Sequence, residues 1–214
     1  MGLGQADLER HIAWDIGVEA TGLRLAAELE ACFIHQAYSR LVIDCNRAPG
    51  SAASIPLVSD GTPILGNAGL SKADIADRVG TIYEPYQARI AQELDERRSR
   101  NVSTILVALH SFTPCLDGLD RPWRYGVLHR HDSPFSASFL RAMSVAIGPE
   151  VGDNHPYAMD ETDNTVPLHR AGRDIDYLEL EVRQDLIADA AGQAKIAREI
   201  AHFLVKAQND MVGP

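Results

Sequence analysis

Hydrophobic and charged residues alternate strictly along residues 176–183. The apolar positions are Leu178, Leu180 and Val182, and the charged positions between and after them are Glu179, Glu181 and Arg183. A period of two residues is typical of a β-strand whose two faces meet different surroundings. Residues 102–109 become uniformly apolar towards their end, which predicts a central strand covered on both faces. A further strand is predicted over residues 124–129.

Four other stretches carry apolar residues at helical spacing. The predicted helices cover residues 15–31, 71–100, 133–145 and 190–207. The second begins with an N-cap signal, in which Asp74 follows Ser71 by three positions, and we expect it to bend at Pro85. The third begins at Ser133 because Pro134 is well suited to the first helical position.

The segments between these elements complete the predicted fold. Short strands are predicted at residues 31–35 and 40–44, and long loops at residues 46–70 and 149–166. Strands that alternate with helices are typical of α/β proteins. We therefore predict a three-layer α/β sandwich around a mixed central sheet, formed by a single domain over residues 1–214.

Composition and charge exclude several functional classes. The 214 residues include 30 acidic and 20 basic side chains, for a formal net charge of -10. Proteins that bind nucleic acids need a basic surface to displace counterions, so we expect no nucleic-acid partner. Charged residues interrupt every apolar run, so we predict no contact with a membrane. With no signal-peptide pattern and no CxxC pair among the three cysteines, the sequence predicts a cytoplasmic protein.

Three polar clusters follow or end the apolar strand-like runs, at residues 44–47, 110–114 and 179–185. Ligands of open α/β sheets bind outside the carboxyl ends of the strands. Polar side chains at these positions can therefore converge on one cleft although they lie far apart in the sequence. This placement makes the three clusters the first candidates for a functional site.

Each cluster offers a chemical role and a structural alternative. His110 can bind zinc through an imidazole nitrogen, or it can hydrogen-bond a turn. The planar guanidinium of Arg47 suits a carboxylate, or it can pair with one of the many acidic side chains. Glu181 and Glu179 share one strand face, where a carboxylate can take a proton from water. The alternative is that Arg183, on the same face, neutralises one of them.

Other residues invite similar readings with less support. His129 and His131 share a strand face, which is compatible with a metal site and also with an ordinary surface pair. Cys115 follows His110 closely, as in a Cys-His nucleophilic pair, but the sequence specifies no third group to orient the base. His155 and His169 lie in loop-like segments and are candidate neighbours of a substrate.

Taken together, the chain resembles the N-formylglutamate amidohydrolase family, a branch of the zinc-carboxypeptidase-like hydrolases. The matching stretches occur in the family's order along nearly the whole chain, and they are residues 11–17, 38–47, 59–64, 66–67, 110–114, 152–154 with 156–157, and 179–187. No stretch is decisive alone, but their ordered combination is specific.

The resemblance implies a zinc-carboxypeptidase-like fold and hydrolysis of N-formyl-L-glutamate, or a similar N-acyl amino acid, to formate and the amino acid. It implies zinc or another divalent metal as cofactor, with His110 as a ligand and Asp15 as an acidic one. The general base is Glu181, with Glu179 second. Asn46 and Arg47 handle the substrate, and Arg47 either binds the substrate carboxylate or stabilises the developing oxyanion. We add Arg183 as a substrate-binding candidate.

Two departures from the family pattern stand out. Residues 85–87 read Pro-Tyr-Gln where the family pattern leads us to expect Pro-Tyr-His. The resemblance also leads us to expect an N-terminal strand and a Cys-x-His-like segment ahead of residues 11–15, which supplies another metal ligand. The sequence opens almost directly at that stretch, so we expect an incomplete metal site. The alternative function is a metal-free, non-catalytic relative that binds a small carboxylate near Arg47.

Overall fold

The computed structural model describes residues 1–212 and divides them into two compact units. The first unit comprises residues 1–14, 34–103 and 161–173, and the second comprises residues 15–33, 104–160 and the described residues from 174 onward. Each unit is thus assembled from segments far apart in the sequence. That the chain forms a single domain stays a prediction. No helix within residues 1–212 is both long enough and apolar enough to cross a lipid bilayer.

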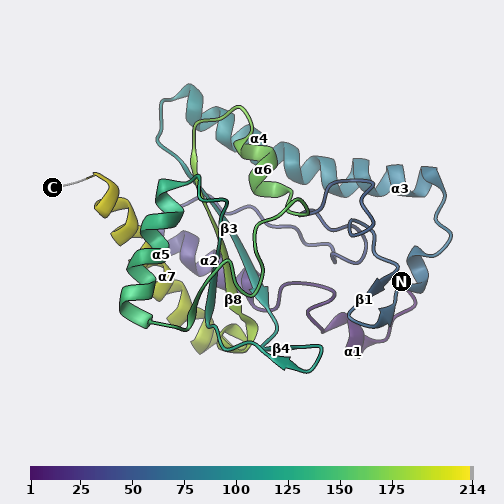
Figure 1. The fold of residues 1–214 in the computed structure, drawn as a ribbon. Helices are drawn as coiled ribbons and strands as arrows, with labels where there is room; N and C mark the ends of the chain where they lie inside the picture. Colours follow the sequence, from purple (N-terminus) through teal and green to yellow (C-terminus); the bar gives the residue numbers. More distant parts are fainter. Residues whose placement is uncertain (213–214) are drawn as a thin grey trace. The chain divides into compact units, whose positions relative to one another are not determined.

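The second unit is built on a four-stranded mixed sheet with the strand order β3-β8-β6-β7. Its strands are β3 (Ile105–Phe112), β8 (Asp176–Arg183), β6 (Tyr125–Leu128) and β7 (Val151–Asp153). Strands β3 and β8 are parallel and lie side by side (Figure 1), whereas β6 runs antiparallel to β8 and parallel to β7. The predicted α/β class with a mixed central sheet is therefore confirmed.

Three helices cover one face of this sheet. They are α2 (Val18–Leu29), α5 (Pro134–Ile147) and α7 (Ala190–Val212), and α7 packs against both of the others. The apolar side chains of β8 are fully buried in one cluster with Phe139 of α5 and Ile200 of α7. Burial of a large apolar side chain stabilises a fold by about 1.5–3 kcal/mol. The short elements η3 (Gln184–Ile187), β4 (Cys115–Leu116) and β5 (Leu119–Asp120) complete the unit.

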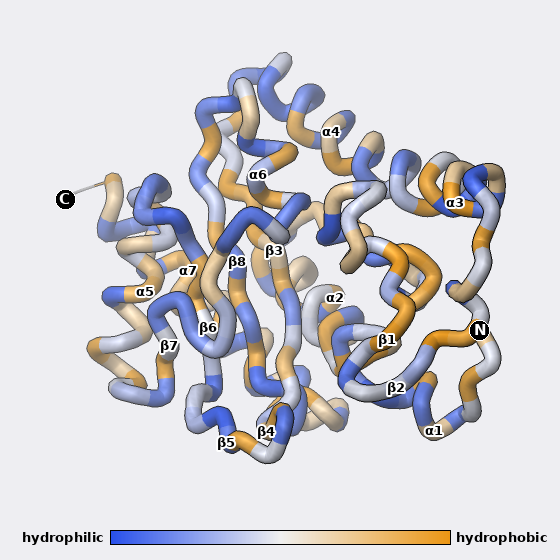
Figure 2. The backbone as a smooth tube through the Cα atoms, turned by 45° about the vertical axis from the view of Figure 1, so that its right-hand side comes forward, coloured by the Kyte–Doolittle hydropathy of each residue, from blue (hydrophilic) through white to orange (hydrophobic). Residues whose placement is uncertain are grey.

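The opposite face of the sheet carries the charged positions of β8. Hydrophilic and hydrophobic colours alternate along β8 in Figure 2, as the sequence pattern requires. Glu179 and Glu181 are nevertheless buried, with exposed fractions of 2% and 8%. Carboxylates are rarely buried unless they are paired or functional, so this face of the sheet is the candidate location of the functional site.

The first unit contains short elements around two small apolar clusters. Its elements are α1 (Gln5–Leu8), β1 (Val58–Ser59), β2 (Thr62–Pro63), η1 (Leu65–Asn67), α3 (Lys72–Arg78), η2 (Val79–Tyr83), α4 (Glu84–Ser99) and α6 (Thr165–Arg170). One cluster surrounds Leu41 and Ile64, and the other surrounds Ile43 and Tyr83.

Residues 40–47 form turns and irregular backbone in this unit, so the strand predicted at residues 40–44 is wrong. Leu41 and Ile43 are buried as the apolar pattern indicated. The backbone carbonyls beside them are bound by side chains instead of by a neighbouring strand. Asn67 donates to the Leu41 carbonyl at 2.9 Å, and Arg78 donates to the Val42 carbonyl at 2.8 Å.

Most other predicted elements are confirmed with shifted ends, and one is missing. Residues 31–35 form no strand, and the two predicted loops contain β1, β2, η1 and β7. The helix predicted at residues 71–100 consists of α3, a π-helical turn (η2) and α4, with Pro85 in the first turn of α4. Its start is the predicted one, because Ser71 and Asp74 form a reciprocal capping box.

Candidate active site

His110 and Glu181 occupy the same row of the sheet in the second unit. They are register partners on the parallel strands β3 and β8, so their side chains lie on the same face. The row continues through Gly126 of β6 and Gly152 of β7. A Cβ atom at Gly126 would overlap the carbonyl oxygen of His155, so the chain at His155 lies directly over this part of the face.

Asp15 binds His110 directly. One carboxylate oxygen of Asp15, Oδ2, lies 2.8 Å from Nδ1 of His110. An acidic partner on one ring nitrogen fixes the orientation of the imidazole and directs the other nitrogen outward. The Nε2 atom of His110 makes no hydrogen bond with any residue among 1–212. The prediction that His110 and Asp15 are both metal ligands stays a prediction, and the contact shows that the two side chains lie together.

The chain that carries Asp15 is held to β3 by its neighbours. The hydroxyl of Ser111, which follows His110, donates to the Ile16 carbonyl at 3.0 Å. Gly17 has a φ of 78°, in the left-handed region, and a Cβ atom there would overlap the Ile187 carbonyl oxygen. Only glycine meets both conditions without strain. Gly17 therefore allows the close approach that brings Asp15 to His110.

The site attracts positive charge. Burial by itself lowers the pKa of His110, but the hydrogen bond and charge of Asp15, with the charges of Glu181 and Glu179, raise it to about 10. One imidazole therefore lies among three carboxylates. A site with this balance stabilises a cation, whether a proton or a metal ion.

The fit of these residues to a metal ion is partial. The donor types, imidazole nitrogen and carboxylate oxygen, are those that zinc binds, and Nε2 of His110 is available. A catalytic zinc site needs three protein ligands. Within residues 1–212, no group of three His, Cys, Asp or Glu side chains is arranged to hold a metal ion. His110 and Asp15 therefore provide the donor chemistry of such a site without a complete set of ligands.

Arg47 and Asn46 belong to the first unit, where both are engaged. The Nη1 atom of Arg47 donates to the carbonyls of Asn46 and Thr162 at 3.0 and 3.2 Å, and to Asp163 Oδ1 at 3.3 Å. The ion pair with an acidic side chain, the alternative role of Arg47, is therefore present. The Nε and Nη2 atoms donate to no described residue. One edge of the guanidinium is fixed, and the other edge remains available to an anion.

Asn46 connects the same loop to α6. Its Oδ1 atom accepts hydrogen bonds from the backbone N–H groups of Asn164 and Thr165 at 3.3 and 2.9 Å. Asn46 thereby satisfies donors at the start of the helix, as a capping residue does. This contact fixes the backbone around Arg47. No observation tests whether Asn46 also binds a substrate, so that role stays a prediction.

Gln87, which stands where the family pattern leads us to expect histidine, is a buried connector. Its Nε2 donates to the Cys45 carbonyl at 2.7 Å, and its Oε1 lies 2.7 Å from Nε2 of His169. His169 must donate in that contact because the amide oxygen can only accept. Burial, followed by the charge of Arg173, lowers the pKa of His169 to about 4, so the ring is neutral. Neither residue was assigned this role from the sequence.

Arg183 is occupied by contacts within the second unit. Its Nε and Nη2 atoms bind both oxygens of Asp185 at 2.8 and 3.2 Å, and Nη1 donates to the carbonyls of Arg121 and Trp123. It is thus neutralised by Asp185, and not by Glu179 or Glu181 as the sequence alternative had it. The substrate-binding role of Arg183 stays a prediction, and its hydrogen bonds to Asp185, Arg121 and Trp123 do not support it.

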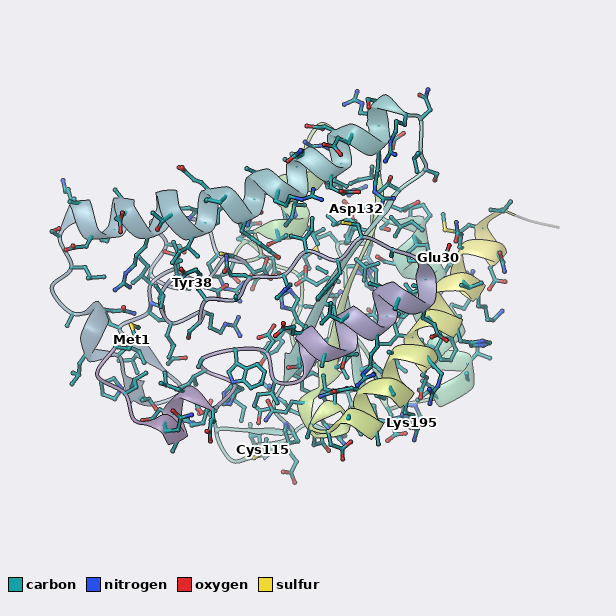
Figure 3. The ribbon with its side chains drawn as sticks, turned by 180° about the vertical axis from the view of Figure 1, so that it is seen from behind. Met1, Glu30, Tyr38, Cys115, Asp132 and Lys195 are labelled. Atoms are coloured by element: carbon teal, nitrogen blue, oxygen red, sulfur yellow. The ribbon has the colours of Figure 1, made fainter. Side chains whose placement is uncertain are left out.

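The remaining sequence candidates have structural partners or lie in exposed positions. His129 Nε2 contacts Asp153 at 2.9 Å, and the His131 ring packs edge-on against His129. Cys115 lies exposed in the β4–β5 hairpin (Figure 3), and the bonded partner of His110 is Asp15, which gives no support to a Cys115–His110 nucleophilic pair. The convergence of all three polar clusters stays a prediction, because residues 44–47 lie in the first unit and the other two clusters in the second.

Comparison with known proteins adds to this geometry. The chain is similar to gene product Atu2144 from Agrobacterium tumefaciens, whose crystal structure is known. The two sequences are 32% identical, and the structures align with a TM-score of 0.95 over 99% of this chain and 84% of that one. An N-formylglutamate amidohydrolase from Ralstonia eutropha JMP134 is 18% identical, with a TM-score of 0.60 over 79% of this chain and 73% of that one, a likeness of fold alone. No curated protein matches the chain in sequence. The family model described as N-formylglutamate amidohydrolase matches residues 2–188, and the chain therefore belongs to that family.

Proposed function

We propose that the protein hydrolyses the amide bond of an N-formyl or other N-acyl amino acid, with N-formyl-L-glutamate as the first candidate substrate. The products are formate and the free amino acid. The observation that carries this proposal is the row that pairs buried Glu181 with His110, oriented by Asp15, on one face of the sheet. Membership of the amidohydrolase family supports the same reaction.

Glu181 acts as the general base in this proposal. Its carboxylate takes a proton from water as the water oxygen bonds to the formyl carbon. The carbon–nitrogen bond then breaks, and Glu181 delivers the proton to the leaving nitrogen. The register favours Glu181 over Glu179, because Glu181 is the partner of His110 whereas Glu179 is the partner of Ala108.

The metal is the second part of the proposal. His110 and Asp15 would hold a divalent ion, with zinc as the first candidate. The negative charges of Asp15, Glu179 and Glu181 favour a cation at this place. Such an ion, when bound, polarises an amide carbonyl and makes water more acidic. The residues of the chain keep their own tasks: Asp15 orients the imidazole, and Glu181 moves the proton.

Arg47 is proposed to bind a carboxylate group of the substrate. Its fixed Nη1 and its available Nε and Nη2 atoms support this role, because a guanidinium edge of two N–H groups matches a carboxylate. Asn46 supports Arg47 through the loop that it fixes to α6. The ligand is thus a small acidic molecule.

The test is formate release from N-formyl-L-glutamate by the protein supplied with zinc and by the same protein treated with a chelator. We expect release that depends on the metal and resists alkylation of the exposed thiols Cys32 and Cys115. If alkylation abolished the activity and the chelator left it unchanged, the protein would be a cysteine-dependent hydrolase and the proposal would be wrong.

A second candidate function is favoured by Gln87 and by the partial metal site. A non-catalytic relative would bind a small carboxylate near Arg47 without hydrolysis. Binding of N-formyl-L-glutamate by the zinc-supplied protein, with no formate released and no metal retained, would establish this function instead.

A further inference from the structure

Three arginines gather where strands β3 and β8 end, and one of them differs from the others. Arg183 pairs with Asp185, and Arg124 lies 3.4 Å from Glu199. Arg121 forms no ion pair with any residue among 1–212. This is notable in a chain with 30 acidic and 20 basic side chains. A guanidinium without an acidic partner is suited to an anionic ligand.

The guanidinium of Arg121 is fixed on one edge. Its Nη1 atom donates to the Tyr157 hydroxyl at 2.8 Å and, more weakly, to the Thr113 carbonyl at 3.5 Å. Its Cζ atom lies 4.7 Å from the centre of the Tyr157 ring and 6.0 Å from that of Phe112. The Nε and Nη2 atoms donate to no residue that the structure describes. Two aromatic rings thus orient a cation whose other edge remains available.

The backbone around Arg121 is also fixed. Its N–H donates to the Pro114 carbonyl at 2.8 Å, and its carbonyl accepts from Arg183 Nη1 at 3.4 Å. Two residues further on, Trp123 stacks on His155 with 4.6 Å between ring centres. That stack ties the segment of Arg121 to the segment of Tyr157. A cation held in this way loses little conformational freedom when it binds a ligand.

Arg121 is related to the row of His110 and Glu181 through Phe112. Phe112, one of its two aromatic neighbours, follows His110 by two positions on β3 and faces the same side of the sheet. Two residues of a strand span roughly 7 Å. The side-chain carboxylate of N-formylglutamate is five bonds from the formyl carbon and reaches about 6 Å, whereas the α-carboxylate is three bonds away.

We propose that Arg121 is a specificity-determining residue that binds the side-chain carboxylate of an acidic N-acyl amino acid. This inference rests on the proposed function, because it places the scissile amide at Glu181 and His110. Tyr157 and Arg183 are positioning residues, which hold the side chain and the backbone of Arg121. No sequence pattern indicates Arg121, which follows the β4–β5 hairpin and belongs to none of the three polar clusters.

The experiment compares two substrates that differ in one charge. N-formyl-L-glutamine has the size of N-formyl-L-glutamate but carries a neutral amide in place of the side-chain carboxylate. For Arg121→Gln we expect kcat/KM on N-formyl-L-glutamate to fall about 10- to 100-fold, mainly through KM, with little change on N-formyl-L-glutamine. Arg121→Lys should recover part of the loss. Arg141→Gln, which removes an arginine of α5, is the matched control and should behave like the wild type on both substrates.

An equal fall on both substrates, or no fall on either, would overturn the role of Arg121 and leave the proposed function standing. If the wild-type protein hydrolyses neither substrate, the proposed function fails, and calorimetric binding of glutarate tests Arg121 by itself. Binding that weakens at least about 10-fold in Arg121→Gln but not in Arg141→Gln supports the inference. Equal binding by the wild type and Arg121→Gln, or no binding at all, contradicts it.

Discussion

The pairing of His169 with Gln87 predicts a loss of stability in mild acid. His169 is 2% exposed and donates to Gln87, so the folded protein holds it neutral. Its pKa is about 4 in the folded state, against 6.5 for an ordinary histidine. Between pH 6.5 and about 4, His169 is protonated in the unfolded chain and neutral in the folded protein. The contribution of His169 to stability is therefore complete above pH 6.5 and decreases as the pH falls towards 4.

The size of the effect follows from the pKa difference. Each pKa unit corresponds to about 1.4 kcal/mol, so a difference of about 2.5, from 6.5 to about 4, gives at most about 3.5 kcal/mol. Water that reaches the ring reduces this value, and we expect about 1 to 3 kcal/mol between pH 7 and pH 4.

The assay is urea unfolding at a series of pH values for the wild type and for His169→Gln. Carboxylates also titrate in this range, so the quantity of interest is the difference between the two proteins. The wild type should lose about 1 to 3 kcal/mol more than the variant as the pH falls from 7 to 4. Gln87→Glu, which gives the imidazolium a charged acceptor, should reduce the excess loss. Parallel pH profiles of the wild type and His169→Gln would refute the reasoning.

Three further substitutions test other parts of the structure. Gly17→Ala should lower the free energy of unfolding by roughly 1–3 kcal/mol, because the new Cβ atom would meet both a positive φ and the Ile187 carbonyl oxygen. Urea unfolding measures this change, and unchanged stability would contradict the expectation. Asn46→Ala should cost about 1–2 kcal/mol and speed hydrogen exchange at the Thr165 amide, whereas unchanged protection would deny the capping contact. Phe139→Ala, at a fully buried ring between Phe135 and Phe203, should cost about 3–5 kcal/mol in thermal or urea unfolding, and a loss below about 1 kcal/mol would contradict the described core.

The second unit was predictable because its elements are long and regular. The alternation over residues 176–183 coincides with β8, and the Ser133-Pro134 signal coincides with the start of α5. Local chemistry fixes such elements, so a local pattern reveals them. The same pattern placed Glu181 on a strand, whereas His110 was expected just after the strand predicted at residues 102–109 and lies within β3, in register with Glu181.

The first unit was harder to predict because distant side chains hold its backbone. The run from Leu41 to Ile43 has the composition of a strand, but Asn67 and Arg78 bind its carbonyls, and Gln87 binds the carbonyl of Cys45. No local pattern shows that a side chain far along the sequence replaces a neighbouring strand. Arg121 was missed for a related reason, since its significance comes from Tyr157 and from the absence of an acidic partner among the described residues.

The central claim is that Glu181, in register with His110, is the general base of an amidohydrolase. It is tested most directly by the rate of formate release from N-formyl-L-glutamate by Glu181→Gln relative to the wild type, with Glu179→Gln measured alongside. A general base contributes about 100- to 10,000-fold, so Glu181→Gln should lose at least about 100-fold in kcat while Glu179→Gln retains more activity. Wild-type turnover by a folded Glu181→Gln protein, or a larger loss in Glu179→Gln, would contradict the claim.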